Sequence, residues 1–230
     1  MSGAPRDAES TPRTAASRVR VLIVEDHPLV REGLVARISA QPDLEVCAEA
    51  TGIEEALQAM RAMRPDLMIV DLALKEENGL DLIKRAKADA ACPQILVVSA
   101  YEESIFGERA LEAGARGYVH KHELPELVIE AIRTVLRGEL YVSIGMTKRL
   151  AERALTAKHS ASGIDGLTDR ELQIFELIGR GRSTRQIAEQ LHRSIHTIES
   201  HREKIRAKLQ LRSGVELVRH AVQWILENAP

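Results

Sequence analysis

The sequence predicts an α/β domain with a five-stranded, parallel, doubly wound sheet, followed by a smaller all-α domain of four helices. Three observations support this prediction. In residues 19–138, five short runs of apolar β-forming residues alternate with five helical patterns, as expected for a parallel sheet covered on both faces. Residues 166–230 contain only helical patterns, joined by short turns. The chain has 230 residues, which is enough for two domains with separate cores.

The strands and helices of the first domain are predicted from apolar spacing. Strands are expected at residues 19–24, 44–48, 67–71, 94–99 and 117–120. Helices are expected at residues 29–38, 53–63, 80–86, 105–113 and 124–136. Residues 139–165 are predicted to be a linker that contains one short helix at 147–155. Residues 1–18 are rich in Ala, Ser, Thr, Pro and Arg without apolar periodicity, so a disordered tail is expected there.

The two parts of the chain differ in charge. Residues 19–138 hold 14 Lys and Arg against 21 Asp and Glu, whereas residues 166–230 hold 11 against 8. This suggests cation binding in the first domain and polyanion binding in the second. Cys47 and Cys92 lack the spacing of a metal or redox motif, so we expect reduced core residues. No apolar run is long enough to cross a bilayer, which predicts a soluble, cytoplasmic protein without a membrane partner.

Polar side chains stand at the carboxyl ends of four predicted strands. Glu25 and Asp26 follow the first strand, and Asp71 ends the third. Ser99 ends the fourth strand and Lys121 follows the fifth. Because connections in such folds are right-handed, these strand ends are expected to meet at one rim of the sheet. Three carboxylates packed together repel one another, and Mg²⁺, which prefers hard oxygen ligands, would neutralise them.

This set of groups suits phosphoryl transfer. Asp71 would be the nucleophile, Mg²⁺ would bridge carboxylate and phosphoryl oxygens, and Ser99 and Lys121 would hold the remaining oxygens. Each residue also has a structural explanation, because an aspartate can cap a helix or turn, a serine can lie in a turn and a lysine can be solvated. Their joint occurrence at four strand ends, in the expected order, favours a functional site.

Residues 19–138 resemble the receiver domain of two-component response regulators. The matching segments are VLIVEDHPLVREGL at 21–34, Asp71 with Gly79 and Leu80, VVSA at 97–100 and AGARGYVHK at 113–121. The resemblance implies a flavodoxin-like fold in which Asp71 accepts a phosphoryl group from a sensor histidine kinase. It implies Mg²⁺ ligands at Glu25, Asp26, Asp71 and the backbone carbonyl of Ala73. It also implies that Ser99 and Lys121 contact the phosphoryl group, and that Tyr118 swings inward as Ser99 moves.

The sequence departs from the pattern of this family at three positions. Glu25 stands where many members have a first aspartate, which lengthens one arm of the acidic pair. Lys75 stands where many members have proline, and His120 stands beside Lys121 where an apolar residue is usual.

The second domain begins with a capping box, because Thr168 is followed three residues later by Glu171. The helix that follows has the apolar set Leu172, Phe175, Leu177 and Ile178, and glycines at 179 and 181 end it. Ser183 and Ser194 are expected to cap the next two helices, the second of which runs from residue 195 to about 209. A fourth helix is expected at 215–226. Short helices joined by turns of three or four residues match a helix-turn-helix.

The third helix of this domain has two different sides. Ile198, Ile205 and Leu209 share one side, while polar residues occupy the opposite side and the flanks. A recognition helix needs such a polar face to reach base edges and phosphates, although an ordinary amphipathic helix also has one. The candidate DNA-binding residues are Arg185, Thr197, Glu199, Ser200, His201, Glu203, Lys204, Arg206 and Lys208.

Residues 167–209 resemble the LuxR-type DNA-binding domain. The matching segments are LTxRE from residue 167, STRQIA from 183, TIESH from 197 and IxxKL from 205. Together with the first domain, the chain resembles the NarL/FixJ family of transcriptional regulators. The resemblance implies that a homodimer binds double-stranded DNA, that the last helix contributes to dimerisation, and that Glu199, Ser200 and Glu203 face bases. RNA polymerase is a further partner that such a regulator could contact.

We therefore expect a phosphorylation-controlled, DNA-binding transcriptional regulator that is not an enzyme. Two alternatives are open at this point. A phosphohydrolase would also use Asp71 as a covalent nucleophile, but such enzymes commonly have a second acid two residues later, where this chain has Ala73. A regulator that works without phosphorylation would use its first domain only for dimerisation or protein binding.

Overall fold

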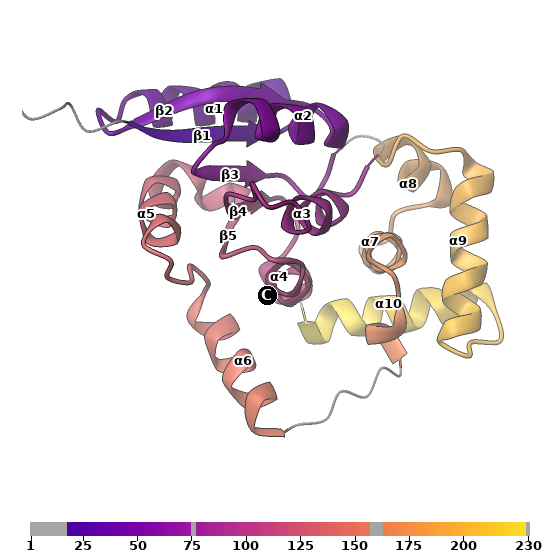
Figure 1. Cartoon of the computed structure of the whole chain (residues 1–230). Coiled ribbons are helices and arrows are strands. Elements are labelled where there is room, and N and C mark those ends of the chain that lie inside the picture. Colours follow the sequence, from indigo (N-terminus) through magenta and orange to yellow (C-terminus); the bar gives the residue numbers. More distant parts are fainter. Residues whose placement is uncertain (1–17, 75–76, 157–162, 229–230) are drawn as a thin grey trace, which may run out of the picture.

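The computed structural model of the chain describes residues 18–74, 77–156 and 163–228. The predicted tail therefore lies outside the described residues except for Arg18, and so does Lys75. An α/β domain is formed by the first part of the chain and a helical domain by the last, and they pack side by side (Figure 1). No helix among the described residues is long and apolar enough to cross a membrane.

The described residues of the α/β domain form one five-stranded sheet. Its strands are β1 (Val19–Val24), β2 (Leu44–Ala50), β3 (Leu67–Val70), β4 (Gln94–Ser99) and β5 (Gly117–His120). They lie in the order β2-β1-β3-β4-β5, and each neighbouring pair is parallel. The predicted parallel sheet is confirmed, with β2 two residues longer than expected. Strand β3 ends at Val70, so Asp71 lies just beyond it instead of inside it.

Helices cover both faces of this sheet. They are α1 (Pro28–Ser39), α2 (Ile53–Met63), α3 (Gly79–Lys87), α4 (Glu103–Ala113) and α5 (Leu124–Leu136). Successive residues of β1 alternate between the faces because a strand has a period of two. Ile23 packs with the apolar side chains of α1 and α5, whereas Leu22 and Val24 pack with those of α2, α3 and α4. The predicted doubly wound architecture is therefore confirmed.

A sixth helix follows the sheet and packs on α4. Helix α6 (Ile144–Thr156) begins three residues earlier than the sequence pattern predicts. The Ser143 hydroxyl explains this start, because it accepts a hydrogen bond from the Met146 backbone N–H at 3.1 Å. The Ser143 backbone N–H in turn donates to Glu103 Oε1 at 2.9 Å. Met146 is fully buried, and this side chain fixes the helix to the α/β domain.

The helical domain has four helices within residues 163–228, as predicted. They are α7 (Asp169–Gly179), α8 (Thr184–Gln190), α9 (Ile195–Lys208) and α10 (Gly214–Asn228). The predicted capping box of Thr168 and Glu171 is present, and Ser183 forms a second one with Gln186. Ser194 caps α9, as predicted. Helices α8 and α9 form the expected helix-turn-helix, and α7 and α10 pack closely behind them (Figure 1).

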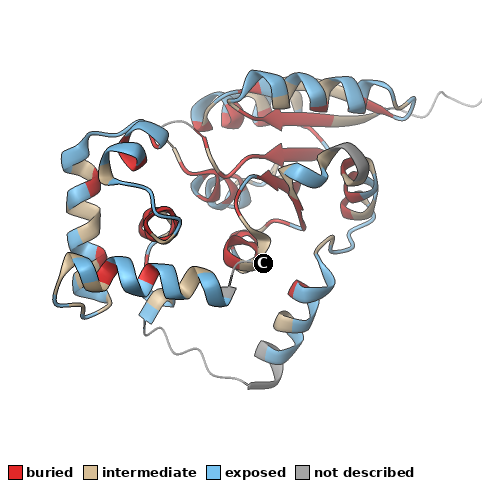
Figure 2. Cartoon of the chain, turned by 180° about the vertical axis from the view of Figure 1, so that it is seen from behind, coloured by how far each residue is buried: buried red, intermediate tan, exposed pale blue. Residues whose placement is uncertain are grey.

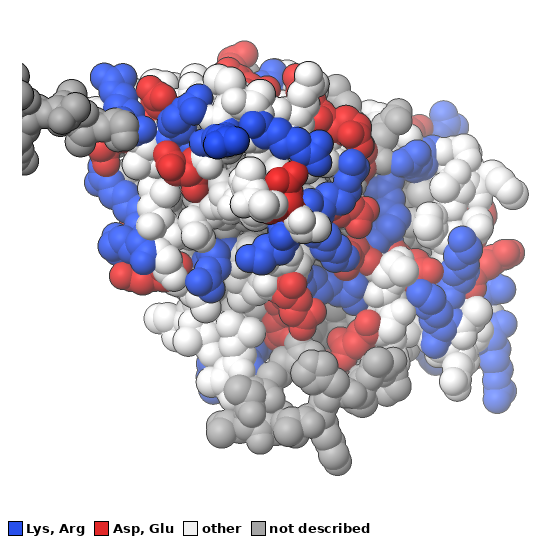
Figure 3. Space-filling view, viewed as in Figure 1, with Lys and Arg blue, Asp and Glu red and all other residues white. Residues whose placement is uncertain are grey.

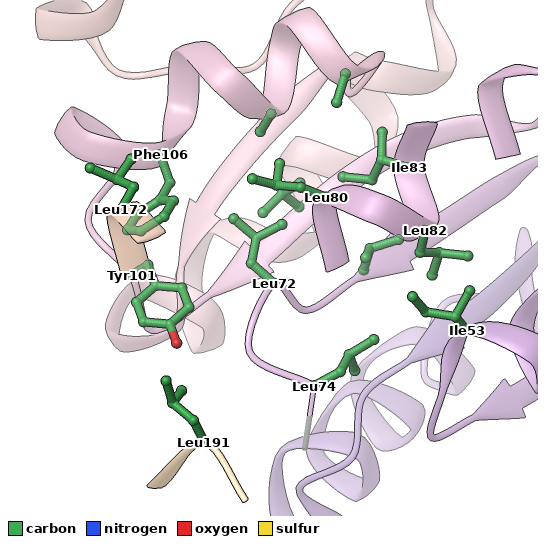
Figure 4. Close-up of a cluster of buried hydrophobic side chains, with 14 of the residues drawn as sticks. Ile53, Leu72, Leu74, Leu80, Leu82, Ile83, Tyr101, Phe106, Leu172 and Leu191 are labelled. Carbon is green, nitrogen blue, oxygen red and sulfur yellow. The ribbon is translucent and has the colours of Figure 1, made fainter. Parts of the chain in front are cut away.

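Helix α7 is buried on all sides. Eight consecutive residues, from Glu171 to Ile178, have little solvent exposure, and Figure 2 shows this helix in the centre of the helical domain. One of its sides meets the α/β domain. Figure 4 shows Leu172 and Leu191 of the helical domain near Phe106 and Tyr101 of the α/β domain. The two domains therefore share one continuous apolar cluster.

Candidate functional site

Asp71 is held at the carboxyl end of β3 by its backbone and by the loop that follows. Its backbone N–H donates to the Val24 carbonyl at 2.9 Å, and its Oδ1 accepts from the Ala73 backbone N–H at 3.0 Å. Gly79 closes the loop, because a Cβ at this position would lie 2.2 Å from the Asp71 carbonyl oxygen. Only a glycine allows this approach, so the start of α3 fixes the backbone of Asp71.

Three carboxylates meet beside this position. Glu25, Asp26 and Asp71 can each place an oxygen within 4.8 Å of the other two. Glu25 is 1% exposed, and its Oε1 accepts a hydrogen bond from the His27 backbone N–H at 3.0 Å. Burial, followed by the negative charge of Asp71, raises the pKa of Glu25 to about 7. Negative charge is unfavourable in this cluster of carboxylates, and a hard divalent cation bound to their oxygens would compensate it. The cluster therefore fits such a cation.

Lys121 supplies positive charge to the same cluster. Its Nζ lies 2.8 Å from Asp71 Oδ2 and 2.7 Å from Glu25 Oε2. The residue directly follows β5, two strands away from β3. Burial alone would lower the pKa of the Lys121 ammonium, but the attraction of Asp71 and Glu25 outweighs burial and raises it. The ammonium therefore stays charged and offsets negative charge of Asp71 and Glu25.

Ser99 and Tyr118 lie behind this rim. Ser99 is fully buried at the end of β4, next to β3, and its Oγ accepts a hydrogen bond from the Tyr101 backbone N–H at 3.2 Å. The Tyr118 ring is also buried, and its hydroxyl donates to the Tyr101 carbonyl at 2.8 Å. Tyr101 is thus bonded to both residues through its backbone. Tyr101 was not among the site residues predicted from the sequence, and the signal that could have identified it is its position two residues after Ser99.

A cavity of about 330 Å³ opens above Asp71, and both domains line it. Asp26, Asp71 and Lys121 line its floor from the α/β domain. Gln173 of α7, Gln190 of α8 and the following Leu191 line it from the helical domain. The helical domain is therefore part of the wall around the phosphoacceptor candidate.

His120 lies at the edge of this region. Its Nε2 is 3.2 Å from the Ala100 carbonyl oxygen, and its ring stacks on that of His122 with 4.9 Å between centroids. Glu102 Oε1 lies 4.0 Å from the same Nε2. His120 thus borders the loop after β4, which carries Tyr101.

Polar contacts that sequence reasoning missed connect the two domains. Arg109 of α4 donates through Nη1 to the Leu167 carbonyl at 2.8 Å and to Asp169 Oδ1 at 3.0 Å. Lys84 of α3 contacts Asp169 Oδ2 at 2.5 Å. The Gln173 side-chain amide donates to the Tyr101 hydroxyl. Nothing in the local spacing of these residues distinguishes them from solvated side chains.

Helix α9 carries its apolar side inward and its polar side outward. Ile198 and Ile205 are fully buried and Leu209 is partly buried, as predicted. Glu203 and Lys204 are exposed. The helix lies on the side of α7 that faces away from the α/β domain, and Figure 3 shows Lys and Arg side chains along this edge with acidic ones among them. Its polar side is open to a large partner.

The predicted DNA-binding residues differ in their contacts. Lys208 Nζ contacts Glu171 Oε2 at 2.6 Å, so it stabilises the start of α7. Arg185 pairs with Glu189 at 3.0 Å, and Thr184 donates to Glu199 at 2.8 Å. The remaining predicted residues are exposed or partly exposed on α9: Thr197, Ser200, His201, Glu203, Lys204 and Arg206. Arg202 also lies on this helix and was not among the predicted residues.

Both domains match known protein families. Residues 21–133 match the family described as "Response regulator receiver domain". Residues 165–221 match the family described as "Bacterial regulatory proteins, luxR family". The oxygen regulatory protein NreC of Staphylococcus haemolyticus is 36% identical over 213 residues, which are 89% of this chain and 97% of that protein. The response regulator UvrY of Escherichia coli is 30% identical over 211 residues, with coverage of 92% and 97%.

Solved structures have the same architecture. A LuxR-family two-component response regulator from an Aurantimonas species has a TM-score of 0.55 and 33% identity, covering 60% of this chain and 99% of that one. The RcsB response regulator of Salmonella typhimurium has a TM-score of 0.62 with coverage of 90% and 98%, and at 23% identity it shows the fold alone. The chain belongs to the NarL/FixJ family of two-component response regulators, which are transcription regulators and not enzymes, with a receiver domain joined to a LuxR-type DNA-binding domain.

Proposed function

We propose that Asp71 accepts a phosphoryl group from a sensor histidine kinase and that this phosphorylation controls DNA binding by a dimer. The observation that carries the proposal is the position of Lys121 Nζ between Asp71 Oδ2 and Glu25 Oε2, at 2.8 and 2.7 Å. A lysine that follows one strand thus neutralises acids that follow two others. Such convergence costs desolvation of several charges, which is characteristic of functional sites and not of ordinary surface residues. The proposed units are residues 19–138, a linker at 139–165, and residues 166–230.

The chemistry needs a nucleophilic carboxylate and compensation for negative charge. A carboxylate oxygen of Asp71 attacks the phosphorus of phosphohistidine, the P–N bond breaks, and the released imidazole takes a proton from solvent. Mg²⁺, when held by Glu25, Asp26, Asp71 and the Ala73 carbonyl, would neutralise charge on the phosphoryl oxygens. The Lys121 ammonium binds one of these oxygens, and the Ser99 hydroxyl rotates to donate to another.

Movement of Ser99 would alter the contact between the domains. Its Oγ now accepts a hydrogen bond from the Tyr101 backbone N–H at 3.2 Å, and the Tyr101 hydroxyl accepts one from Gln173 of α7. If Ser99 turns toward a phosphoryl oxygen, the Tyr101 backbone loses this partner. The proposed inward movement of Tyr118 would also act on Tyr101, because the Tyr118 hydroxyl donates a hydrogen bond to the Tyr101 carbonyl. Phosphorylation would therefore shift the equilibrium between joined and separated domains.

Dimerisation would use the last helix. Val215, Val218, Val222 and Leu226 of α10 are 79%, 41%, 37% and 79% exposed and recur at helical spacing. Such an apolar stripe fits a second copy of the same helix in a two-fold arrangement. The polar side of α9 from each copy would then enter the major groove of double-stranded DNA. Solved RcsB structures are described as bound to promoters and as dimers on DNA, which supports this proposal.

The phosphoacceptor is tested by incubating the chain with acetyl phosphate and Mg²⁺ and measuring intact mass. The parent should gain one phosphoryl group, and Asp71→Asn should gain none. Asp81→Asn on α3 is the matched control, because it removes a receiver-domain carboxylate outside the acidic cluster. A label that persists in Asp71→Asn would place the acceptor elsewhere, and labelling that survives chelation would remove the proposed role of Mg²⁺.

DNA recognition is tested by selecting bound sequences from a random pool, before and after phosphorylation. Phosphorylation should enrich a site with two-fold symmetry. Ser200→Ala should change which bases are enriched, because Ser200 lies in the predicted base-reading part of α9. Enrichment of the same sequences by both proteins would exclude Ser200 from base reading. Enrichment unaffected by phosphorylation would favour a regulator whose receiver domain does not act as a switch.

A further inference from the structure

We infer that the DNA-binding domain selects the phosphodonor of its own receiver domain. In the closed arrangement seen here, the chain accepts phosphate from a small acyl or amido phosphate. A phosphohistidine carried on a protein reaches Asp71 only after the two domains separate. This inference rests on the proposed role of Asp71 as phosphoacceptor.

The first observation is that the DNA-binding domain covers the acceptor. Gln173, Gln190 and Leu191 form one wall of the cavity above Asp71. Gln173 and Leu191 are 1% and 4% exposed, so they are packed in place and do not extend freely into solvent. The Gln173 amide is bonded to the Tyr101 hydroxyl, and Figure 4 shows Leu191 next to the Tyr101 ring. This wall is therefore anchored to the receiver domain.

The second observation is the size of the remaining space. The cavity measures about 330 Å³, which is at the lower end of the range for sites that hold small molecules, roughly 300–1,000 Å³. A small phosphate ester or amide fits such a space. A histidine on a protein arrives with the helix that carries it, and a helix with its side chains is about 10 Å across. That helix would have to occupy the volume now taken by Gln190 and Leu191.

The third observation is that the closed arrangement is held by contacts outside the cavity. Arg109 binds the Leu167 carbonyl and Asp169, and Lys84 binds Asp169 from the other side. Arg180 reaches Glu102 at 3.4 Å. These contacts end on α7 and on the residues that directly precede and follow it. Helix α9 lies on the side of α7 that is away from the receiver domain (Figure 1). The contact thus covers the phosphoacceptor and leaves the DNA-reading face of α9 open.

These positions provide variants that separate the domains without touching the cavity. Arg109→Ala and Lys84→Ala remove contacts to Asp169, and neither residue lines the space above Asp71. Arg133→Ala is the matched control, because Arg133 pairs with Asp43 on the surface of the receiver domain at 3.3 Å. Trp224 is the single tryptophan of the chain and lines a second space between the domains, so its fluorescence reports on their separation.

The experiment compares two phosphodonors on each full-length protein. One donor is acetyl phosphate, and the other is a histidine-phosphotransfer domain charged with phosphoramidate and then desalted. Phosphorylation rates are measured by intact mass. In the double variant of Lys84 and Arg109, the rate from the protein donor should rise about tenfold relative to the rate from acetyl phosphate. A tenfold change corresponds to about 1.4 kcal/mol in the free energy that favours the closed over the separated domains. The Arg133→Ala control should keep the ratio of the parent.

Several results would overturn the inference. If the double variant shifts Trp224 emission but changes both rates equally, the wall does not select the donor. If each single variant leaves the ratio of rates at the parental value while Trp224 emission shifts, closure does not limit access of the protein donor. The proposed acceptor is judged separately from the choice of donor. If Asp71→Asn is labelled by neither donor while the other variants are labelled, Asp71 remains the acceptor whatever the ratio of rates. Labelling of Asp71→Asn by either donor would instead refute the proposed function itself.

Discussion

The Tyr118 hydroxyl donates a hydrogen bond to the backbone carbonyl of Tyr101, with 2.8 Å between the two oxygens. Burial raises the pKa of the Tyr118 phenol well above its usual range, so the hydroxyl keeps its proton and remains a donor. The Tyr101 backbone N–H bonds Ser99, and its hydroxyl bonds Gln173 of the DNA-binding domain. Tyr101 therefore connects the rim that carries Asp71 with helix α7.

Replacement of Tyr118 by phenylalanine should destabilise the chain. The variant leaves the buried Tyr101 carbonyl without the phenolic donor, and an unsatisfied buried acceptor costs about 1–3 kcal/mol. Urea unfolding should show this loss. Tyr141→Phe is the control, because Tyr141 is only partly buried and removal of its hydroxyl should cost less. Equal losses in the two variants would mean that the bond to Tyr101 contributes nothing specific.

The stability of the chain should depend on the protonation of Glu176. This carboxyl group is 1% exposed on α7, and its Oε1 accepts from Arg180 Nε at 2.9 Å. No hydrogen-bond partner among the described residues reaches its Oε2. Burial raises the pKa of Glu176 to about 7, Arg180 opposes this increase, and Glu102 of the receiver domain adds to it. The native state therefore favours the protonated form.

The sign of this dependence follows from the raised pKa. The contribution of Glu176 is fully present below its unfolded value of 4.5 and is lost as the pH rises through about 7. Glu176→Gln should flatten this part of the profile and be more stable than the parent at about pH 8, by roughly 1 kcal/mol or more. Urea unfolding of both proteins from about pH 5 to about pH 8 measures this difference in the free energy of unfolding. Glu189→Gln, on the exposed side of α8, should follow the parental profile.

Lys208 and Lys204 should respond differently to replacement by alanine. Lys208 pairs with the buried Glu171. Burial alone would raise the pKa of the Glu171 carboxyl, but hydrogen bonds from Lys208 and Thr168 outweigh burial and lower it. This stabilisation is present above the unfolded pKa of Glu171 and is lost in acid. Lys208→Ala should therefore lower the free energy of unfolding at neutral pH by about 1–3 kcal/mol.

Lys204→Ala should leave stability nearly unchanged, because Lys204 is exposed on α9. It should instead weaken binding to all DNA sequences and reduce the salt slope by about one unit, as expected for loss of one phosphate contact. Titration of DNA binding at several salt concentrations measures the slope. An unchanged slope would exclude Lys204 from the phosphate contacts.

Gly79 should tolerate no side chain. A Cβ at this position would lie 2.2 Å from the Asp71 carbonyl oxygen and 2.7 Å from the Leu72 Cα, both of them backbone atoms that cannot move alone. Gly79→Ala should therefore displace the loop that holds Asp71 and reduce both stability and labelling by acetyl phosphate. Gly33→Ala is the control on α1, because a Cβ there would meet nothing within 4 Å. A fully labelled Gly79→Ala would show that this loop does not position the acceptor.

Much of the fold could be read directly from residue order. The alternation of apolar runs with helical patterns predicted five parallel strands, and the polar residues after those runs predicted the rim where Asp71, Glu25 and Lys121 meet. The rim follows from the right-handed connections that bring the carboxyl ends of parallel strands to one edge of the sheet. The strands and helices themselves depend on neighbours in sequence, because the period of a strand or helix fixes which side chains share a face. The apolar side of α9, with Ile198 and Ile205, was predictable for the same reason.

The contact between the domains was decided only by tertiary structure. Gln173 and Glu176 have the spacing of ordinary polar helix residues, yet both are 1% exposed against or near the receiver domain. Their partners stand far away in sequence: Gln173 bonds Tyr101 across 72 positions, and Asp169 pairs with Lys84 across 85. Periodicity describes one element at a time, whereas burial here depends on how two separate surfaces fit. For this reason the sequence determined the rim that carries Asp71, and the packing of α7 against α4 determined that the DNA-binding domain covers it.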